Sequence, residues 1–280
     1  MLTVQTVYDL RQQIRAAQAA GQRIGLIPTM GALHEGHIAL VERARRECDL
    51  VVCSVFVNPI QFNNPDDLAR YPRTLEADQQ MLEKAGCDLV FAPSAQEMYS
   101  EPARLRINFG ELETVMEGAF RPGHFNGVGI VVAKLFNLIQ PDKAYFGQKD
   151  LQQVAVIRRL IRDLSFPVEL IRCDTVREPD GLAMSSRNRL LSPEDRAAAP
   201  ALYEALTMAH ELMAEGQSPS LAKASVTGFF SQRPGFTLEY VDVANADTLQ
   251  PVPEMQAPGQ TAICIAAHLG KVRLIDNLVF

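Results

Sequence analysis

The stretch IGLIPTMGALHEGH, residues 24–37, joins two different hydrophobic patterns. It begins with a short apolar run that ends at Pro28, as a buried strand does. From Gly36 onward the apolar residues follow helical spacing, with the charged stretch ERARR on the other face. These residues are Ile38, Leu40, Val41, Ala44 and Cys48. The pattern predicts a strand that turns directly into a helix, which is the repeating unit of an α/β fold.

The same alternation continues to about residue 177. We expect strands at 49–58, 87–93, 103–109, 143–147 and 167–176. We expect helices at 1–17, 74–85, 127–140 and 150–164. The stretch 127–140 fits a helix or a strand by periodicity, and its length and the Pro-Asp turn after it favour a helix. This order predicts a Rossmann-like parallel sheet with helices on both faces.

The pattern changes after Arg177. A helix is expected over 192–216, because Ser192 is a good N-cap and Gly216 a good stop. A second helix should begin near Ser220, followed by strands at 236–243, 262–267 and 272–277. We therefore predict two domains. Residues 1–177 form a Rossmann-like domain that binds nucleotide and substrate, and residues 178–280 form a smaller α+β lid domain.

The composition excludes several classes of protein. The 280-residue chain has a net charge of 27 − 33 = −6 and no Lys/Arg-rich run, so we expect no nucleic-acid partner. The segment RARR at 43–46 is interpreted as the solvated face of a helix. The five cysteines are scattered, which argues against a disulfide scaffold or a zinc site. Neither a signal peptide nor the ~18 apolar residues of a membrane span is found, so the expected location is the cytoplasm.

Four polar motifs follow the predicted strands. They are PTMGALHEGH, VNPIQF, FGQKDLQQ and TVREPDGLAMSSRN. In sheets of this kind, ligands bind outside the carboxyl ends of the strands, near a switch in strand order. We therefore expect all four motifs at one edge of the sheet.

The first motif places His34 and His37 at the beginning of a helix. The free N–H groups and the positive dipole end there favour a phosphate. Two imidazoles add donors that can follow charge onto a phosphoryl oxygen as a bond breaks, and Gly31 and Gly36 allow close approach. Two alternatives remain open: the histidines only cap the helix or satisfy the loop, or they bind a metal. No nearby Cys, Asp or third His completes a metal set.

Two further motifs supply positive charge. Gly147 marks a tight turn, Lys149 carries a fixed charge, and Asp150 is suited to cap the next helix. The segment 185–187 (SSR) offers hydroxyls and a guanidinium on a loop that would close over a triphosphate and stabilise departing pyrophosphate. By themselves, such a lysine and such a loop are often ordinary surface and linker.

The remaining motif supplies neutral amides. Asn58 and Gln61 follow a buried strand, and Gln153 lies near the beginning of its helix. Amides suit a substrate that carries hydroxyls and a carboxylate better than they suit a metal. We therefore assign Asn58, Gln61 and Gln153 to the binding of such a substrate.

The combination of HxGH with a later Met-Ser-Ser-Arg loop is similar to the nucleotidylyltransferase superfamily and to class I aminoacyl-tRNA synthetases. Six blocks in order between about residues 23 and 192 closely resemble the pantothenate synthetase (pantoate–β-alanine ligase) family. They are PTMGALHEGH, FVNPIQF, DLARYPR, FRPGHFNGV, AYFGQKDLQQ and REPDGLAMSSRN. The chain departs from the class I synthetase loop at Ala183 and Ser186, where those enzymes carry lysines.

The resemblance implies a two-step reaction. Pantoate attacks the α-phosphate of ATP to give pantoyl adenylate and pyrophosphate, and the amine of β-alanine then releases pantothenate and AMP. It also implies Mg²⁺ carried on ATP, with Asp150 as a candidate ligand and no resident metal. A homodimer and a place in coenzyme A biosynthesis are implied as well.

The resemblance also implies roles for individual residues. His34, His37, Lys149 and Arg187 would be catalytic. His37 is usually given the proton-donor role, although hydrogen bonding to the phosphates would serve the same transition state. Gln61 would hold pantoate and border the β-alanine site, and Gln153 would hold pantoate. The ATP site would comprise Met30, Gly31, Ala32, Leu33, His34, Glu35, Gly36, His37, Gly147, Gln148, Lys149, Asp150, Val176, Met184, Ser185, Ser186 and Arg187.

Three other functions fit parts of the pattern. The nearest is another adenylate-forming or nucleotidyl-transferring enzyme of the same fold with a different acceptor. The amides of VNPIQF and KDLQQ argue against a phosphorylated acceptor. A non-catalytic nucleotide-binding regulator would tolerate loss of His37, Lys149 or Arg187, yet all three are present. A purely structural α/β subunit leaves the grouping of polar motifs unexplained.

Overall fold

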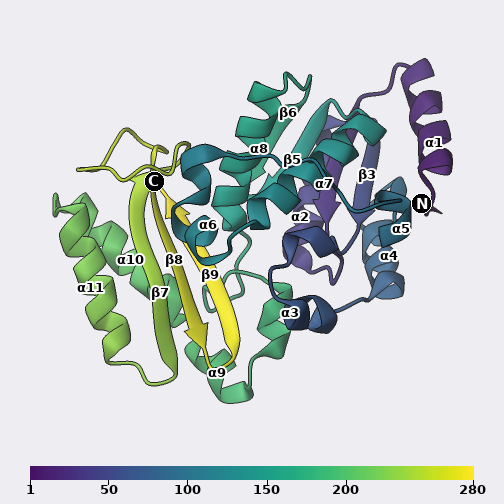
Figure 1. Cartoon of the computed structure of the whole chain (residues 1–280). Helices are drawn as coiled ribbons and strands as arrows, with labels where there is room; N and C mark the ends of the chain where they lie inside the picture. The colour runs from purple at the N-terminus through teal and green to yellow at the C-terminus, as the bar shows by residue number, and fades with distance from the viewer. The chain divides into compact units, whose positions relative to one another are not determined.

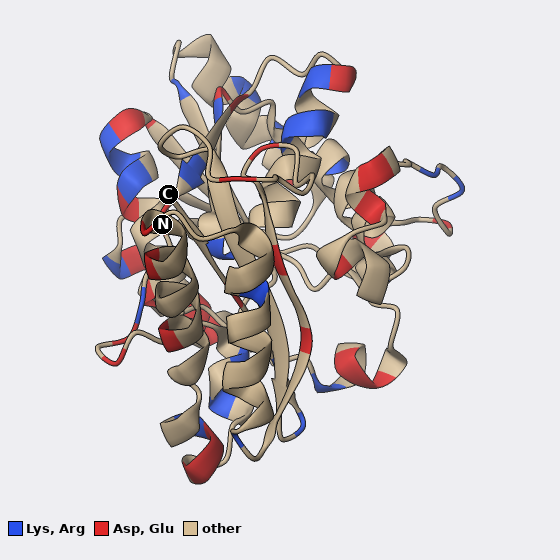
Figure 2. Ribbon diagram, turned by 90° about the vertical axis from the view of Figure 1, so that its left-hand side faces the viewer, with Lys and Arg blue, Asp and Glu red and all other residues tan.

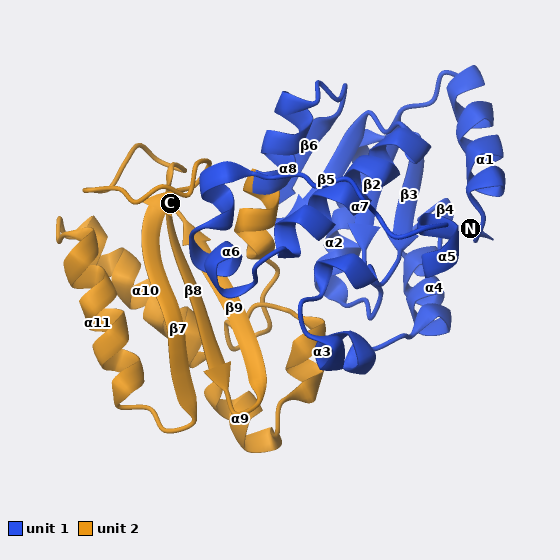
Figure 3. Ribbon diagram, in the orientation of Figure 1, with its two compact units in different colours: residues 1–147, 156–173 blue, residues 148–155, 174–280 orange.

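The structure is a computed structural model that describes all 280 residues. The chain divides into two compact units (Figure 3). Unit 1 comprises Met1–Gly147 and Val156–Cys173, and unit 2 comprises Gln148–Ala155 and Asp174–Phe280. The predicted domain boundary at residue 177 stays a prediction.

Unit 1 contains a six-stranded sheet in the order β1-β4-β3-β2-β5-β6, and every neighbouring pair is parallel (Figure 1). The strands are β1 Leu2–Val4, β2 Ile24–Thr29, β3 Leu50–Val55, β4 Leu89–Phe91, β5 Lys143–Gly147 and β6 Glu169–Cys173. The predicted Rossmann-like parallel sheet is therefore confirmed.

Helices connect these strands. The α-helices are α1 Val7–Ala19, α2 Glu35–Glu47, α3 Pro65–Arg70, α4 Leu75–Lys84, α5 Ala95–Met98, α6 Met116–Phe120, α7 His124–Ile139 and α8 Leu151–Asp163. The 3₁₀ turns are η1 Pro59–Gln61, η2 Gly110–Glu113 and η3 Gln148–Asp150. The expected helix at 127–140 is confirmed as the greater part of α7.

Helices cover both faces of the sheet, because parallel strands need right-handed crossover connections. Helices α2 and α4 pack together on one face, where their apolar side chains join β2, β3 and β4 in one core. Helix α1 packs against α7 on the opposite face. Burial on both faces explains why β2 and β3 are almost entirely apolar.

The sheet has a switch in its strand order. Strand β2 leads through α2 to β3 on one side, whereas β5 lies on the other side of β2 and is followed by β6. The carboxyl ends of β2 and β5 therefore flank the position at which α/β proteins of this topology bind ligands.

Unit 2 is built around an antiparallel sheet with the order β7-β8-β9. Its main helices, α10 and α11, pack on one another and on the sheet, and they share its apolar core. The elements are η4 Ser186–Leu190, α9 Pro193–Ala198, α10 Ala201–Ala214, α11 Pro219–Ser231, β7 Phe236–Asn245, β8 Thr261–Leu269 and β9 Val272–Val279. The predicted α+β character of this part is confirmed.

The prediction of a helix over 1–17 is wrong at its beginning. Residues 2–4 form β1, which pairs with β4, and the helix begins only at Val7. Thr6 ends the extended segment, because its hydroxyl accepts a hydrogen bond from the backbone N–H of Asp9 at 3.1 Å and so caps α1.

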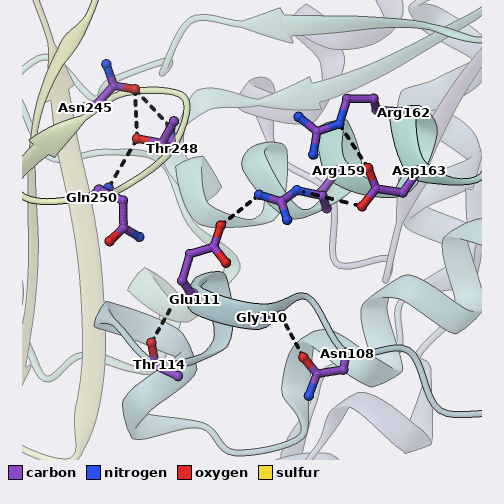
Figure 4. A network of polar contacts seen from close by, with 10 residues as sticks. All are labelled: Asn108, Gly110, Glu111, Thr114, Arg159, Arg162, Asp163, Asn245, Thr248 and Gln250. Carbon is purple, nitrogen blue, oxygen red and sulfur yellow. Dashed lines mark hydrogen bonds and ion pairs between the residues drawn. The ribbon is translucent and has the colours of Figure 1, made fainter.

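The prediction of a strand at 103–109 is also wrong. Two backbone N–H groups of this segment bond to side chains, and the segment pairs with no strand. That of Ile107 donates to Asn126 at 2.9 Å and that of Phe109 to Glu113 at 3.1 Å. Figure 4 shows the end of the segment, where Asn108 accepts from the N–H of Gly110 at 2.7 Å. Glu111 then binds Arg159 at 2.8 Å, which fixes the loop to the carboxyl-terminal half of α8.

The single helix predicted over 192–216 is two helices, α9 and α10. The N-cap at Ser192 is as expected, and its hydroxyl accepts from the N–H of Asp195 at 3.1 Å. Helix α9 ends at Ala198 because Pro200 has no N–H to donate to the preceding turn. The second helix then begins at Ala201.

Charges of both signs are interspersed on the ribbon (Figure 2). The RARR segment lies in α2 as predicted, with Arg43, Arg45 and Arg46 exposed. Arg43 is paired with Glu47, and Arg45 binds Asp88 at 2.9 Å. In none of the helices is there an apolar stretch of the length that crossing a membrane requires.

Candidate active site

The loop between β2 and α2 turns sharply after Thr29. The hydroxyl of Thr29 donates to the carbonyl of Ser54 on β3 at 2.7 Å and accepts from the N–H of Gly31 at 3.2 Å. Gly31 has φ +80°, and a Cβ there would lie 2.9 Å from a carboxylate oxygen of Asp78. This position therefore requires glycine for both its conformation and its close approach.

A buried carboxylate accepts hydrogen bonds from the backbone of the loop between β2 and α2. Asp78 on α4 is only 2% exposed. Its two oxygens accept from the N–H of Ala32 at 3.0 Å and of Leu33 at 2.8 Å, and one also accepts from the Thr74 hydroxyl at 3.2 Å. Ala32 and Leu33 are themselves buried, so they form the floor of the loop. Sequence reasoning missed Asp78, since nothing local links it to a loop about 45 residues earlier.

His34 and His37 cap α2 together. Nδ1 of His34 accepts from the N–H of Gly36 at 3.2 Å, and Nδ1 of His37 accepts from the N–H of His34 at 3.4 Å. The ring centroids are 4.1 Å apart. Because Nδ1 of each ring is an acceptor, a neutral imidazole carries its proton on Nε2 and is a donor there. The capping role and a donor role toward a phosphate are therefore compatible.

The turn η1 brings the amide motif to this loop. The Nε2 amide of Gln61 lies 3.0 Å from Sδ of Met30, so VNPIQF and PTMGALHEGH meet as expected. The Oε1 atom of Gln61 accepts from Nδ2 of Asn58 at 3.0 Å. Asn58 is 1% exposed, and its bonds are made within the protein.

Helix α7 holds the backbone of η1. The carbonyl of Gln61 is 2.8 Å from Nδ1 of His124, and Nε2 of His124 is 3.2 Å from the guanidinium of Arg121. Since arginine can only donate, Nε2 accepts and Nδ1–H donates to Gln61. A Cβ at Gly127 would lie 2.5 Å from the Ile60 carbonyl, so glycine lets α7 approach η1. The FRPGHFNGV block stands out in the sequence, but the contact of His124 with Gln61 was not expected.

In unit 2, a buried asparagine fixes the turn that carries Lys149. Nδ2 of Asn277 on β9 donates to the carbonyls of Gln148 and Lys149, each at 2.9 Å. Asn277 is 2% exposed. Lys149 is half-buried, and Asp150 is exposed immediately before α8.

A short hairpin brings two other predicted positions together. The N–H of Met184 donates to the carbonyl of Val176 at 3.0 Å, and Gly181 turns the chain with φ +92°. Arg177 anchors this hairpin to β9 by a bidentate pair with buried Asp276, at 2.6 and 3.1 Å. Burial raises the pKa of Asp276, and Arg177 acts in the opposite direction.

The Ser-Ser-Arg segment opens η4. The hydroxyl of Ser185 accepts from the N–H of Arg187 at 3.3 Å. Asn188 fixes the turn by donating to Glu178 at 2.9 Å and to the Ala183 carbonyl at 3.1 Å. Ser186, Arg187 and Met184 are half-buried.

The predicted residues are thus divided between the two units. Unit 1 contains Met30–His37, Asn58, Gln61 and Gly147. Unit 2 contains Gln148–Asp150, Gln153, Val176 and Met184–Arg187, with Gln153 half-buried on the first turn of α8. Gly147 ends β5, and all the others but Gln153 follow the end of a strand or belong to the hairpin after β6 and the turn that follows it.

The chain resembles known proteins of one family over nearly its whole length. The sequence pattern of the pantoate-beta-alanine ligase family matches residues 2–279. A pantothenate synthetase of Agrobacterium fabrum is 50% identical over all of this chain and 96% of that protein. The crystal structure of pantothenate synthetase from Thermus thermophilus has a TM-score of 0.92 and 48% identity, covering 100% of this chain and 99% of that one.

A second solved structure carries ligands. It is the pantoate-beta-alanine ligase from Francisella tularensis complexed with beta-gamma ATP and beta-alanine. It has a TM-score of 0.81 and 36% identity, and covers 100% of this chain and 97% of that one. On its sequence and its fold, the chain belongs to the pantoate–β-alanine ligase family, the pantothenate synthetases.

Proposed function

We propose that the chain condenses pantoate with β-alanine in a reaction that converts ATP to AMP and pyrophosphate. The intermediate, pantoyl adenylate, forms at the HxGH corner, which is the loop after β2 and the start of α2 with His34 and His37. The observation that carries this proposal is the capped start of α2. There Nδ1 of His34 and of His37 accepts a backbone N–H, which makes each Nε2–H a directed donor. Because the chain belongs to this family, we set aside the three alternatives named above: a related enzyme with another acceptor, a non-catalytic regulator and a structural subunit.

The first step needs positioning and charge stabilisation more than proton transfer. A carboxylate oxygen of pantoate forms a bond to Pα, the Pα–O bond to the β-phosphate breaks, and pyrophosphate leaves with the electron pair. No proton moves in this exchange. We therefore assign to His34 and His37 hydrogen bonding to phosphoryl oxygens, as donors that strengthen while charge develops.

In the second step the neutral amine of β-alanine attacks the acyl carbon. The C–N bond forms, the bond from the acyl carbon to the phosphate oxygen breaks, AMP leaves with the electron pair, and the nitrogen loses its proton to the solvent. No covalent enzyme intermediate is required. The enzyme's task is again to hold the amine and the acyl group in line.

Neutral amides suit pantoate, which carries hydroxyls and a carboxylate. Since Oε1 of Gln61 is bound by Asn58, its Nε2 lies on the side of Met30 and keeps one N–H group for a ligand. We propose that Gln61 and Gln153 bind pantoate and that Gln61 borders the β-alanine site. Asn58 was assigned to pantoate from the sequence, and its burial favours a role through Gln61 instead.

We propose Met30–His37, Gly147–Asp150, Val176 and Met184–Arg187 for the binding of the nucleotide, with Lys149 and Arg187 supplying fixed positive charge. ATP and β-alanine are ligands of the related Francisella tularensis enzyme.

Mg²⁺ fits the residues present. Asp150 is an exposed carboxylate next to Lys149, and hard oxygen ligands suit this ion. We propose that Mg²⁺ arrives on ATP and that Asp150 is its candidate protein ligand. When bound, it supplies neutralisation of phosphate charge.

A homodimer, a cytoplasmic location, a lid role for residues 178–280 and a place in coenzyme A biosynthesis belong to the same proposal. The dimer is tested by the mass of the purified protein in light scattering.

The activity is tested by incubating the purified protein with ATP, Mg²⁺, pantoate and β-alanine. Pantothenate, AMP and pyrophosphate should form in equal amounts. Formation of ADP and phosphate, or turnover of other small acids but not pantoate, would overturn the proposal.

A further inference from the structure

A hydrogen-bond relay leads from Tyr99 through Asn58 to Gln61. The Tyr99 hydroxyl donates to Oδ1 of Asn58 at 2.9 Å, and Nδ2 of Asn58 donates to Oε1 of Gln61 at 3.0 Å. The same Nδ2 donates to the carbonyl of Gly127 on α7 at 3.1 Å. All four residues belong to unit 1.

The relay has a fixed direction. If the Asn58 amide were reversed, its oxygen would face two other oxygens, those of Gly127 and Gln61, and its NH₂ would face the Tyr99 hydroxyl. The observed orientation pairs every donor with an acceptor, as buried polar groups require. Burial also raises the pKa of Tyr99, so its hydroxyl keeps the proton that it donates.

The fixed orientation of Asn58 decides which end of the Gln61 amide can face a substrate. Since Oε1 of Gln61 is held by Asn58, Nε2 lies on the side of Met30, whose Sδ accepts one of its two N–H groups at 3.0 Å and leaves the other for a ligand. A free glutamine amide can turn either end toward a ligand, whereas this one offers only a donor. It therefore selects for an acceptor oxygen, such as a carboxylate or a hydroxyl.

The position of Tyr99 does not depend on its hydroxyl. Its ring lies 6.2 Å from that of Phe56 after β3, and Nζ of Lys134 on α7 is 5.6 Å from its centre. Its backbone N–H closes α5 by donating to the Ala95 carbonyl at 2.8 Å. Replacement by phenylalanine should therefore keep the ring in place and remove one hydrogen bond.

We propose that Tyr99 is a positioning residue, which orients the Gln61 amide through Asn58 so that Gln61 offers an N–H group to pantoate. This inference rests on the proposed role of Gln61 in binding pantoate. Tyr99 itself would touch no substrate.

The test compares Tyr99→Phe with Tyr145→Phe. The Tyr145 hydroxyl also bonds within unit 1, to Glu47 at 3.1 Å and with Cys48 at 3.4 Å, but at the opposite end of the sheet. Both variants lose one internal hydroxyl, so a general loss of stability affects both. Only Tyr99→Phe should alter pantoate binding.

The readouts are the KM of pantoate and of ATP, and the Kd of pantoate by calorimetry in the presence of a non-hydrolysable ATP analogue. Tyr99→Phe should raise the KM and Kd of pantoate by about 3- to 10-fold, the worth of one internal hydrogen bond. The KM of ATP should stay within about twofold, and Tyr145→Phe should change none of the three.

The Gln61→Ala variant tests whether Tyr99 acts on pantoate binding through Gln61. In a Gln61→Ala background, Tyr99→Phe should have no further effect on the Kd of pantoate, because the group that it orients is gone. Unchanged pantoate binding in Tyr99→Phe, an equal change for ATP, or the same effect with and without Gln61 would each overturn the relay. If Gln61→Ala itself leaves pantoate binding unchanged, or the wild-type protein binds no pantoate, the proposed function falls instead.

Discussion

The two ends of the unit 1 sheet are held together by different chemistry. At the carboxyl ends of the strands, amides, imidazoles and hydroxyls fix one another through directed hydrogen bonds, as Asn58, Gln61 and His124 do. At the amino ends, charged side chains form ion pairs. Glu47 is paired with Arg43 and with Lys143 at 3.0 Å, and Lys143 also lies 3.4 Å from Glu169.

The two ends of the sheet differ in their interactions because they serve different purposes. Ion pairs near the surface tolerate loose geometry and contribute little each. Hydrogen bonds impose a direction, which a site needs if it is to offer donors at fixed points. We infer that the carboxyl end is built for function and the amino end for stability. Substitutions at the two ends should therefore separate activity from stability.

The largest effect is expected at His37. His37→Ala should lower kcat by about 10²–10³, the usual loss for a donor to developing charge. It should also cost on the order of 1 kcal/mol of stability, since the cap is lost. Steady-state kinetics and thermal unfolding measure the two.

His37→Asn is the matched variant. In this variant the amide oxygen of asparagine can still accept the hydrogen bond from the His34 N–H, whereas the Nε2–H donor of histidine is absent. It should lose as much kcat as His37→Ala and little stability. If His37→Asn kept full activity, His37 would only cap the helix.

The next effect is expected at Asp78, on the face of the sheet that supports the same corner. Asp78→Ala leaves two buried N–H groups, those of Ala32 and Leu33, without acceptors. We expect a loss of about 2–4 kcal/mol in the free energy of unfolding and a lower kcat, because the loop that carries the histidines loosens.

Asp78→Asn keeps the volume of the side chain but has only one acceptor oxygen, so it should fall between Asp78→Ala and the wild type in urea unfolding and in kcat. A stable Asp78→Ala variant with normal kcat would show that the carboxylate does not hold the corner.

A smaller effect is expected at the amino end. Tyr145→Phe removes a hydroxyl that bonds to Glu47 and Cys48, and it should cost about 1 kcal/mol in chemical unfolding. Its kcat and the KM of each substrate should equal those of the wild type. A fall in kcat comparable to that of His37→Ala would remove the distinction between the two ends.

The smallest effect concerns pH. Hydrogen bonds from Arg43 and then Lys143 lower the pKa of Glu47 from 4.5 to about 2. Because the folded-state pKa is depressed, the stabilisation is complete above about pH 5 and is lost as the pH falls toward 2. Since the group is partly exposed, Glu47→Gln should cost at most about 1 kcal/mol at pH 7.

The unfolding free energies of wild type and Glu47→Gln, measured by urea titration, should therefore converge between pH 5 and pH 2. A constant difference over that range would show that the carboxylate charge is not what stabilises this end.

Most of the sheet was predictable because its inner strands are buried on both faces. Strands such as β2, β3 and β5 are short apolar runs that end at polar motifs. The errors arose where local pattern and tertiary context disagree. Residues 103–109 alternate like a strand, yet the N–H groups of Ile107 and Phe109 bond to Asn126 and Glu113. Pro200 alone divides what the hydrophobic spacing presents as one helix.

The site was predictable where its residues are close in sequence. His34 and His37 lie three residues apart at one helix start, so their joint position follows from local structure. The residues that orient the site are distant from it in sequence: Asp78 reaches Leu33, and Tyr99 reaches Asn58. Each of these contacts exists only because α4 or the end of α5 packs beside the sheet, which no local pattern encodes.

We propose that a carboxylate of pantoate attacks ATP at the HxGH corner. The most direct measurement is the exchange of labelled pyrophosphate into ATP by the purified protein with Mg²⁺ and pantoate, without β-alanine. We predict exchange that requires pantoate and that falls by about 10²–10³ in both His37→Ala and His37→Asn. Absence of pantoate-dependent exchange in the wild type, or undiminished exchange in both variants, would contradict it.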